Sequence, residues 1–323
     1  MKYLIVGSGY RSEFFIRSHQ NDPKHTLVGV LTRNQEKADM LKEKYGVETF
    51  TEETKALSTK PDLIVVCVNK TDIHEKSMYY LRLGYRVLQE TPAGLTIDQL
   101  KECYTLGQDN RLFIAEQYIF CETHKARLEA LKTHNTGNAH TLFISEAHDY
   151  HGASLIRAYL NEGLSDFSIR AMSYKNPIVN TDSRTGPVYT GELKNEERVH
   201  MILTYADGKR AFYDFSGIQY HSFIRERTMR LLCERAELNN STLSYLDDDN
   251  HPQTLNVHPL EDQNAEDEAA IALIIDNIAD VIDGGEVLYP LAYALEDAYT
   301  MILMEDAINY PFTEFKRQPM PWH

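Results

Sequence analysis

The chain has 323 residues, of which 42% are hydrophobic and 25% charged, and its formal net charge at pH 7 is −15. This composition is typical of a soluble globular protein, and the length favours two domains over one small core. Nucleic acids and anionic membranes require a basic face, so we expect neither as a partner. A local basic pocket stays compatible with the sequence.

The four cysteines, Cys67, Cys103, Cys121 and Cys233, are widely spaced and form neither a CxxC pair nor a Cys/His metal-binding pattern. We therefore expect buried thiols, no metal site and a reducing, cytoplasmic location. The apolar run at the N-terminus is too short for a secretory signal and predicts a buried strand. No segment approaches the roughly 20 apolar residues of a membrane span.

The first third of the chain alternates short β-branched runs with amphipathic segments, which predicts a parallel sheet covered on both faces. The predicted strands cover residues 2–7, 26–32, 62–68, 85–90 and 111–117. Two of the helices between them carry caps: Asn34 and Gly46 bound one, and Thr96 begins the other. We place this α/β domain at residues 1–118.

Residues 119–323 show a different pattern, which predicts an α+β domain with an open, mostly antiparallel sheet. Strand-like runs cover residues 139–150, 197–206, 209–220 and 228–238, and helical patterns cover 122–135, 267–285 and 291–308. Ala206-Asp207-Gly208-Lys209 predicts a hairpin between two of these strands. His148 and His221 are expected on a face of the sheet. The last two helices could pack back on the first domain.

The segment Val6-Gly7-Ser8-Gly9-Tyr10-Arg11-Ser12 follows the first strand and opens a helix. Gly7 allows a tight turn, and Gly9 lets the backbone approach a pyrophosphate at the helix N-terminus. Ser12 replaces the third glycine of the dinucleotide fingerprint and is small enough for close packing. Gly7, Gly9, Tyr10 and Arg11 are therefore candidate cofactor contacts.

The second strand ends in Leu31-Thr32-Arg33-Asn34, without the acidic residue that holds a free ribose 2′-hydroxyl. Arg33 could pair with a 2′-phosphate, and Thr32 could donate a hydrogen bond to it. This favours NADP over NAD. A solvated surface role for Arg33 is an equal alternative.

With these elements placed, the chain resembles the glucose–fructose oxidoreductase / inositol dehydrogenase / MocA family. The likeness rests on GSGYR at the start, on residues 61–94 with Asn69, His74 and Glu90, on HGASLIRAYL at 151–160, and on the two closing helices. The resemblance implies a Rossmann domain, a second domain with an open sheet, NAD or NADP, and sugar- or polyol-like substrates. It also implies a homodimer or homotetramer formed through the outer face of the second sheet.

Hydride transfer to a nicotinamide needs a group that takes the substrate's proton or supplies it. The resemblance places Thr91 where the family has its catalytic Lys, and a Thr hydroxyl does not titrate near neutral pH. It places His151 at the catalytic His, and Ala147 where the family has an acid. Lys70, which follows a strand, and Tyr118, which follows the sixth strand, are further candidates. A polar strand–helix junction is the alternative role for His151, and a solvated loop is the alternative for Lys70.

Two functions follow from these residues. The first is an NADP- or NAD-dependent oxidoreductase in which His151 is the acid–base group and Thr91 a positioning hydroxyl; in a variant of it, bond cleavage recycles the bound cofactor. The second is a dinucleotide-binding sensor or partner protein without redox chemistry, which the loss of Lys and Asp favours. Retention of His151 favours the enzyme.

Overall fold

The computed structural model describes residues 1–18, 24–183, 186–258 and 262–323. The chain divides into two compact units: Met1–Glu122, Glu261–Ala298 and Met320–His323 form the first, and Thr123–Leu260 and Tyr299–Pro319 form the second. The first unit thus combines the N-terminal third of the chain with a segment from its C-terminal part.

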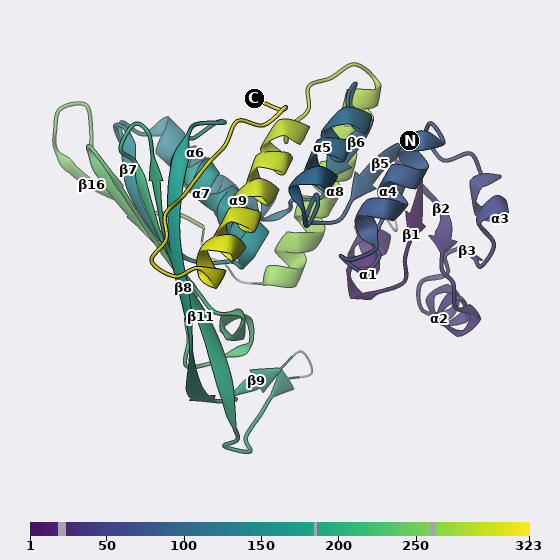
Figure 1. Ribbon diagram of the computed structural model, residues 1–323, viewed down its shortest axis with the longest axis horizontal. Coiled ribbons are helices and arrows are strands. Elements are labelled where there is room, and N and C mark those ends of the chain that lie inside the picture. The colour runs from purple at the N-terminus through teal and green to yellow at the C-terminus, as the bar shows by residue number, and fades with distance from the viewer. Residues whose placement is uncertain (19–23, 184–185, 259–261) are drawn as a thin grey trace. The chain divides into compact units, whose positions relative to one another are not determined.

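The first unit is built on a six-stranded parallel sheet in the order β3-β2-β1-β4-β5-β6 (Figure 1). Its strands are β1 (Lys2–Val6), β2 (Thr26–Leu31), β3 (Thr49–Phe50), β4 (Leu63–Val66), β5 (Arg86–Gln89) and β6 (Leu112–Ile114). Its helices are α1 (Tyr10–Arg17), α2 (Gln35–Tyr45), α3 (Glu53–Leu57), α4 (Ile73–Arg82), α5 (Ile97–Leu106) and α8 (Gln263–Ile282). The order reverses between β1 and β4, as in a doubly wound sheet. The expected fold class is confirmed.

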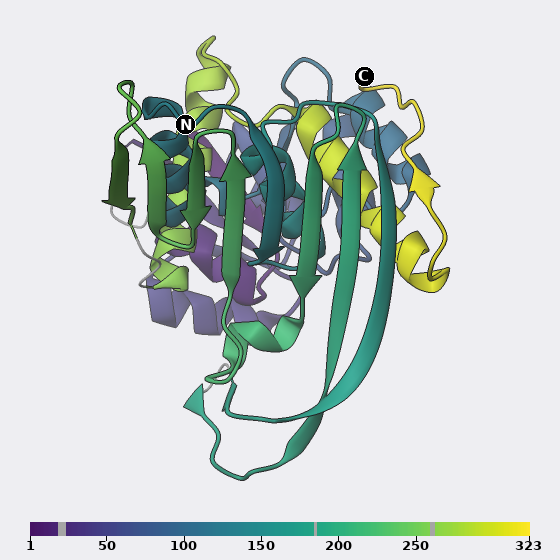
Figure 2. The same cartoon turned by 90° about the vertical axis from the view of Figure 1, so that its left-hand side faces the viewer.

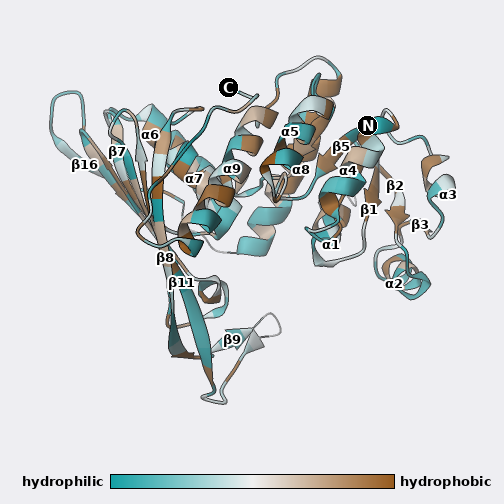
Figure 3. Ribbon diagram, in the orientation of Figure 1, coloured by the Kyte–Doolittle hydropathy of each residue, from teal (hydrophilic) through white to brown (hydrophobic). Residues whose placement is uncertain are grey.

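The caps expected in this unit are present. The Asn34 side chain accepts a hydrogen bond from the Lys37 N–H, and Gly46 ends α2 in the left-handed conformation. Thr96 caps α5 by accepting from the Gln99 N–H. Hydrophobic colour runs along β1 and β2 in Figure 3, and all four residues of β4 are buried. Strands buried on both faces need helices on both sides, which explains their continuous apolar sequences.

Helix α8 completes the core of the first unit although it is more than 250 positions away from β1. Ile271, Ile275 and Ile278 of α8 belong to one buried cluster with Tyr3 of β1 and Phe15 of α1. The side chain of Asp262 caps α8 by accepting from the backbone N–H groups of residues 264 and 265. This packing brings acidic residues of α8 to α1, next to the glycine turn.

The second unit is built on a nine-stranded sheet in the order β16-β15-β14-β13-β7-β12-β11-β8-β17 (Figure 2). Its strands are β7 (Ala139–Ser145), β8 (Phe167–Val179), β11 (Leu193–Tyr205), β12 (Arg210–Phe215), β13 (Thr228–Cys233), β14 (Ala236–Asn239), β15 (Thr242–Leu246), β16 (Pro252–Asn256) and β17 (Phe315–Lys316); β9 (Asp182–Ser183) and β10 (Gly186–Pro187) pair separately. The pairing is antiparallel except between β7 and β12.

The sheet of the second unit has one covered and one open face. Met201 and Leu203 of β11 are buried, whereas Ile202 between them is 45% exposed. Helices α6 (Glu122–Thr133) and α7 (Asp149–Tyr159) lie along the covered face. Alternation of this kind is what a half-covered antiparallel sheet requires. The outer face carries a groove of about 690 Å³ lined in part by Phe143, Met172 and Ile202.

Three predicted strands end earlier than the sequence indicates. The run 139–150 leaves the sheet at Ser145, and α7 begins at Asp149, before His151. The run 209–220 ends at Phe215 and continues as a 3-10 turn, η2 (Gly217–His221). The run 228–238 breaks into β13 and β14. The expected hairpin at 206–209 is confirmed, since the Tyr205 N–H donates to the Lys209 carbonyl at 2.9 Å and Gly208 has a φ of +93°.

Strands β8 and β11 pair over 13 residues each, from Phe167 with Tyr205 to Val179 with Leu193. Figure 1 shows this ribbon continuing past the ends of the neighbouring strands. All four cysteines are free; Cys67, Cys103 and Cys121 are buried as expected, and Cys233 is partly buried. Among the described helices, none has the length and apolar character that a membrane crossing requires.

Candidate functional site

The glycine turn after β1 is shaped for a ligand that approaches the backbone. Gly7 has a φ of +126°, and a Cβ there would lie 2.2 Å from the Cys67 carbonyl oxygen, so only glycine fits. Gly9 is the N-cap of α1, and no heavy atom outside its chain neighbours lies within 4 Å of the place where its Cβ would be. The backbone at Gly9 therefore borders open space, as a pyrophosphate-binding turn requires.

Ser12 fills the position of the third glycine without disturbing the turn. The residue is fully buried, and its hydroxyl donates to the Gly9 carbonyl at 2.6 Å. This hydrogen bond satisfies the only polar atom that serine adds to the packing surface between α1 and the sheet. Ser12 in place of the third glycine is therefore compatible with the turn geometry of a dinucleotide-binding fingerprint.

The end of β2 holds one buried hydroxyl and one exposed cation. Thr32 is buried, and its Oγ1 lies 2.8 Å from the Ser8 Oγ in the glycine turn. Arg33 is exposed, and its side chain forms no ion pair with any residue in the described part of the chain. The hydroxyl of Thr32 thus ties β2 to the turn, and the guanidinium of Arg33 remains available to a phosphate.

The side chains of Tyr10 and Arg11 are directed to α8. The Tyr10 hydroxyl donates to the Asn264 side chain at 3.2 Å. Arg11 Nε donates to Glu90 Oε1 at 2.7 Å, and its Nη1 donates to Asp267 Oδ2 at 3.2 Å. Burial lowers the pKa of Arg11, but the charges of the two carboxylates outweigh burial and raise it above its usual range. Arg11 therefore clamps α1, β5 and α8 together, and its backbone is what borders the turn.

The segment Glu90-Thr91-Pro92 forms a defined turn at the end of β5. The Thr91 N–H donates to Glu90 Oε2 at 3.0 Å, and the Thr91 hydroxyl lies 3.4 Å from the same oxygen. Gln89 Nε2 donates to the carbonyls of Pro92 and Ala93, each at 2.9 Å, and the Thr91–Pro92 peptide is cis. Because Glu90 is held by Arg11 on its other oxygen, the position of the Thr91 hydroxyl is fixed.

The other residues expected in the first unit lie near the ends of β4 and β6. The Asn69 carbonyl accepts from the N–H groups of residues 72 and 73 and so starts α4, and Lys70 beside it is exposed. His74 is buried, with Nε2 2.9 Å from Glu102 Oε2 and Nδ1 3.6 Å from the Cys103 sulfur. These contacts join α4 to α5. Tyr118 is buried and begins the 3-10 turn η1 (Tyr118–Phe120).

His151 is the third residue of α7 in the second unit, and it is buried. Ala147, at the position expected of an acid, is fully buried and accepts a hydrogen bond from the Tyr213 hydroxyl at 3.1 Å. Gly152 allows the helix to approach the sheet, since a Cβ there would lie 2.6 Å from the Tyr213 ring. The first turn of α7 is thus pressed against the end of β12.

A segment that the sequence analysis did not identify contacts this first turn: residues 216–227, here called the strap. The hydroxyl of Tyr220 accepts from the His148 N–H at 3.1 Å and lies 2.7 Å from His148 Nδ1. Arg227 lies over the Tyr220 ring at 5.7 Å, and the rings of His148 and His151 meet edge to face at 5.1 Å. His148 is the N-cap residue of α7. The prediction that it lies on a face of the sheet is wrong.

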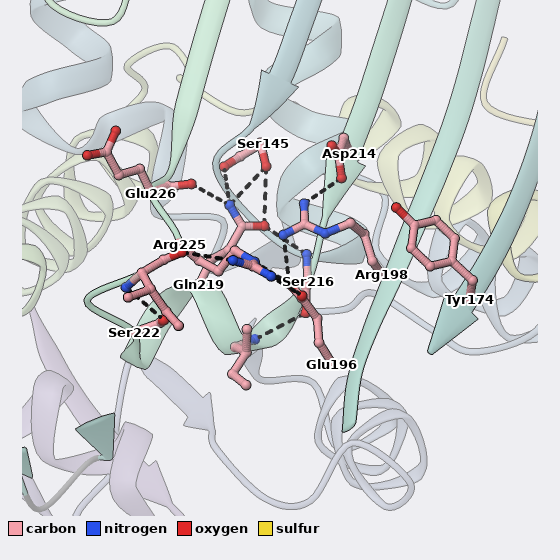
Figure 4. Close-up of polar contacts among 12 residues, drawn as sticks. Ser145, Tyr174, Glu196, Arg198, Asp214, Ser216, Gln219, Ser222, Arg225 and Glu226 are labelled. Atoms are coloured by element: carbon pink, nitrogen blue, oxygen red, sulfur yellow. Dashed lines mark hydrogen bonds and ion pairs between the residues drawn. The ribbon is translucent and has the colours of Figure 1, made fainter. Parts of the chain in front are cut away.

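Two clusters of polar contacts anchor the strap to the sheet (Figure 4). The Gln219 side chain bonds to the Ser145 side chain at 2.9 Å and to the Glu226 carbonyl at 2.6 Å. Arg225 donates through Nε and Nη2 to the buried Glu196, at 2.9–3.1 Å. A buried carboxylate with a bidentate arginine partner holds a loop firmly. No sequence motif indicates this, because β11 and the strap are about 30 residues apart and meet only in the folded unit.

Behind α7, four buried residues form a polar cluster. The Arg127 Nη1 donates to Glu146 Oε1 at 3.0 Å, and His124 Nδ1 lies 2.8 Å from the Tyr159 hydroxyl. Burial lowers the pKa of His124 well below its usual range, and the positive charges of Arg127 and Arg227 lower it further. Burial and the two guanidinium charges therefore favour the neutral form of His124.

Comparison with known proteins gives a family match for the first unit and a fold match for the whole chain. Residues 1–118 match the model described as "Oxidoreductase family, NAD-binding Rossmann fold". A search of curated protein sequences found no match. The structure resembles a putative myo-inositol dehydrogenase from Sinorhizobium meliloti 1021, with a TM-score of 0.72, 15% identity, and coverage of 98% of this chain and 99% of that chain.

Two other solved structures share the fold. One is an oxidoreductase from Agrobacterium radiobacter in complex with NAD+, L-tartaric acid and magnesium, with a TM-score of 0.77 at 10% identity over 98% of both chains. The other is a UDP-N-acetylglucosamine 3-dehydrogenase from Acidithiobacillus ferrooxidans, with a TM-score of 0.71 at 15% identity over 96% of this chain and 98% of that chain. At these identities the likeness establishes a common fold.

Proposed function

We propose that this protein transfers a hydride between a nicotinamide dinucleotide and a small polar substrate, because residues 1–118 match the model of an oxidoreductase family with an NAD-binding Rossmann fold. The observation that carries the proposal is the turn at Gly7 and Gly9. It lies at the carboxyl end of β1, beside the point where the strand order reverses, and it leaves the N-terminus of α1 open. Dinucleotides bind at this place in doubly wound sheets.

The residues around the turn have separate roles in holding the dinucleotide. The backbone of Gly9, Tyr10 and Arg11 at the N-terminus of α1 would bind the pyrophosphate, because that helix end carries a partial positive charge. Arg33 would pair with a 2′-phosphate, which is the basis for a preference for NADP over NAD. Thr32 would fix the turn through Ser8. Asn69, His74 and Glu90 shape the neighbouring ends of β4 and β5.

His151 is the proposed acid–base group. When bound, the nicotinamide supplies the hydride acceptor or donor, so the chain must move only a proton to or from the substrate hydroxyl. An imidazole does this near neutral pH. Thr91 would orient the substrate through its fixed hydroxyl. Lys70 and Tyr118 are further candidates for substrate contact at the edge of the first sheet.

The proposed substrate is a sugar, a polyol or a derivative of one. Solved structures with this fold include proteins named for inositol and for UDP-N-acetylglucosamine. One observation favours an alternative function: Thr91 and Ala147 occupy the positions at which the resemblance expects a Lys and an acid. A chain that binds the dinucleotide but transfers no hydride would act as a sensor or partner protein. One that recycles its bound cofactor during bond cleavage would show no net oxidation.

Parallel titrations with NADPH and NADH test the proposal directly. Nicotinamide fluorescence should rise saturably with both cofactors and at lower concentration with NADPH, after which sugars and polyols are screened for a change in absorbance of the nicotinamide. Failure of both cofactors to bind would contradict the dinucleotide site. Tight binding with no turnover on any member of the panel would favour the sensor or the cofactor-recycling variant.

We also propose a homodimer formed through the outer face of the second sheet. Phe143, Met172 and Ile202 are 37–45% exposed on this face, and the Phe143 ring stacks on that of Phe212 at 4.9 Å. Together they line the 690 Å³ groove. Apolar side chains that gather on one broad, regular face are typical of a surface covered by another protein. A two-fold axis lets the same face cover itself.

A further inference from the structure

Phe312 is an aromatic residue in a backbone conformation that usually requires glycine. It lies in the turn Tyr310-Pro311-Phe312-Thr313, which follows α9 (Leu291–Asn309), and the Thr313 N–H closes the turn by donating to the Tyr310 carbonyl at 3.1 Å. Pro311 occupies the second position of this turn, and Phe312, at the third, has a φ of +69°. This is the pattern of a type II turn, whose third position favours glycine. A bulky side chain at that position strains the backbone.

The strained residue is also one of the most exposed large side chains of the second unit. Phe312 is 83% exposed, so packing within its own copy does little to compensate the strained backbone. A glycine would satisfy the turn better and would remove an apolar ring from water. Strained residues of this kind are concentrated at functional sites. The combination of strain and exposure therefore points to a contact outside the single copy.

The turn holds Phe312 at the groove on the outer face of the second sheet. Phe312 lines this groove of about 690 Å³ together with apolar side chains of the strands, among them Met172 and Ile202. The next residue but one, Glu314, accepts from the Ser168 hydroxyl at 3.1 Å, and strand β17, which follows it, pairs with β8. The turn is thus tied to the edge of the sheet, and the ring is placed before any partner binds.

We propose that Phe312 inserts into the groove of a second copy of this chain. The proposal rests on the homodimer proposed above and adds the residue by which each copy holds the other. In a two-fold contact the same surface meets itself, so that a residue of one copy and its counterpart in the other make equivalent contacts. Phe312 and the groove lie side by side on each copy, and one interface therefore contains two such insertions.

The charges around the groove favour a second copy as the partner. Each Arg and Asp that lines the groove has an ion-pair partner of opposite charge within the same copy, at 2.5–3.3 Å: Arg170 with Glu314, Asp214 with Arg198, and Arg230 with Glu237. A like face can therefore cover the groove without burying an unpaired charge, although each copy has a net charge of −15. A nucleic acid or an acidic peptide would find these cations already paired.

Placing the ring in advance favours association. Folding has already met the cost of ordering the turn, so little conformational entropy is lost when the two copies meet. Aromatic side chains that fill a pocket near the centre of an interface commonly dominate its binding energy. Strain in the free copy is then the cost of presenting the ring to its partner.

Sedimentation equilibrium over a dilution series tests the contact on the full chain. Phe312→Gly should raise the dissociation constant of the dimer at least about thirtyfold, and Phe312→Trp, which keeps an aromatic ring, should retain most of the affinity. The matched control is Phe223→Ala, which removes an aromatic residue of the strap that is 71% exposed and should leave the dimer unchanged. An unchanged dissociation constant in Phe312→Gly, or an equal loss in Phe223→Ala, would overturn the inference.

Thermal unfolding of separate copies distinguishes this contact from a structural role. In the Ile202→Glu background, where the proposed interface is disrupted, Phe312→Gly should leave the melting temperature unchanged or raise it, because glycine adopts a positive φ without strain. A fall of several degrees would show that Phe312 packs within its own copy, and the inference would be wrong.

The outcomes separate this inference from the functions proposed above. A monomeric unmodified protein, or a dimer that survives Ile202→Glu, would remove the interface and the Phe312 contact together. A dimer that Ile202→Glu disrupts and Phe312→Gly does not would remove the Phe312 contact alone. The glycine turn belongs to the first unit, so the NADPH titration decides the oxidoreductase independently of both results.

Discussion

Among the single residues, His151 has the central role in the proposed chemistry, as its acid–base group. It is buried in the first turn of α7, with the His148 ring 5.1 Å away on one side and the Tyr150 ring 5.9 Å away on another. Neither Thr91 nor Ala147 can exchange a proton with a substrate near neutral pH. Of the side chains at positions 91, 147 and 151, the His151 imidazole is therefore the one that can exchange a proton with the substrate.

Replacement of His151 by Ala should abolish turnover and leave cofactor binding intact, because the glycine turn belongs to the other unit of the chain. General acid–base catalysis contributes about 10²–10⁴-fold to rate, so kcat should fall by at least about 10²-fold. Steady-state kinetics and the NADPH titration measure the two quantities on the same preparation. Normal turnover in this variant would remove His151 from the mechanism.

Arg33→Ala should weaken NADPH selectively. The guanidinium is exposed at the end of β2, and a charge-assisted contact to a 2′-phosphate contributes about tenfold in affinity. The affinity for NADH, which lacks that phosphate, should stay the same and serves as the internal control. An equal loss for both cofactors would show that Arg33 supports the turn and does not select the phosphate.

At the scale of elements, the strap and its anchor on β11 decide how the second unit presents α7. Glu196 accepts from Arg225 and Arg198, and Arg198 also donates to Asp214 at 2.5 Å. Burial raises the pKa of Glu196, but hydrogen bonds from Arg225 and Arg198 and the charge of both outweigh burial and hold it below its usual value. The ion pairs therefore favour the charged carboxylate in the folded state.

This lowered pKa predicts a stability difference with a defined pH range. The contribution of Glu196 is fully present above the pKa of an unfolded Glu, about 4.3, and is lost as the pH falls through the lower folded value. Glu196→Gln should cost about 1–2 kcal/mol of unfolding free energy at pH 7, since water screens the partly exposed Arg225. The gap between the two proteins should narrow as the pH falls below about 4.3.

Urea unfolding of both proteins at pH 7 and pH 3 measures this gap. Asn135 lies in a surface contact far along the chain from the strap, with its side chain 3.0 Å from Asp248, so Asn135→Ala serves as a control that should show no such pH dependence. A cost in Glu196→Gln that stays constant down to pH 3 would contradict the role of the charge.

At the scale of the whole molecule, the outer face of the second sheet predicts an assembly of two copies. Ile202→Glu places a carboxylate among Phe143, Met172 and Phe212, opposite Arg170, and burying a charge in a covered interface is unfavourable even when the charge is paired. We expect a dimer in the unmodified protein and a monomer in this variant. Light scattering after size exclusion decides between them.

A matched substitution tests whether the position matters or only the charge. Leu288 is 54% exposed and belongs to the first unit, not to the second sheet, so Leu288→Glu should leave the dimer intact. A monomeric unmodified protein, or an unchanged dimer in Ile202→Glu, would contradict the proposed interface.

Much of the first unit was predictable because its determinants are local. The caps at Asn34, Gly46 and Thr96 act within four residues, and Gly7 is required by a backbone conformation that the strand–turn–helix context already implies. Buried parallel strands also show directly as β-branched runs. The glycine turn and the confirmed fold class follow from these local patterns.

The second unit was less predictable where strands end. Residues 146–148 and 216–220 continue runs that look strand-like, but they lie outside the sheet: the His148 N–H donates to the Tyr220 hydroxyl in η2, and the Gln219 side chain bonds to Ser145 of β7. Alternation of apolar and polar residues cannot distinguish the end of a strand from the start of a strap. Tyr220 was missed for this reason, and His148 was placed on a face of the sheet.

The sequence by itself determined the parallel sheet of the first unit, with its glycine turn at Gly7 and Gly9, and the mostly antiparallel second sheet. Only the tertiary structure decided that Arg11 is a clamp between Glu90 and Asp267, that α8 belongs to the first unit, and that Tyr220 of the strap contacts His148 at the start of α7. The physical reason is how far apart in the sequence the interacting residues are. Caps, turns and strand patterns are fixed by neighbours in sequence, whereas ion pairs and ring contacts form between segments that only folding brings together.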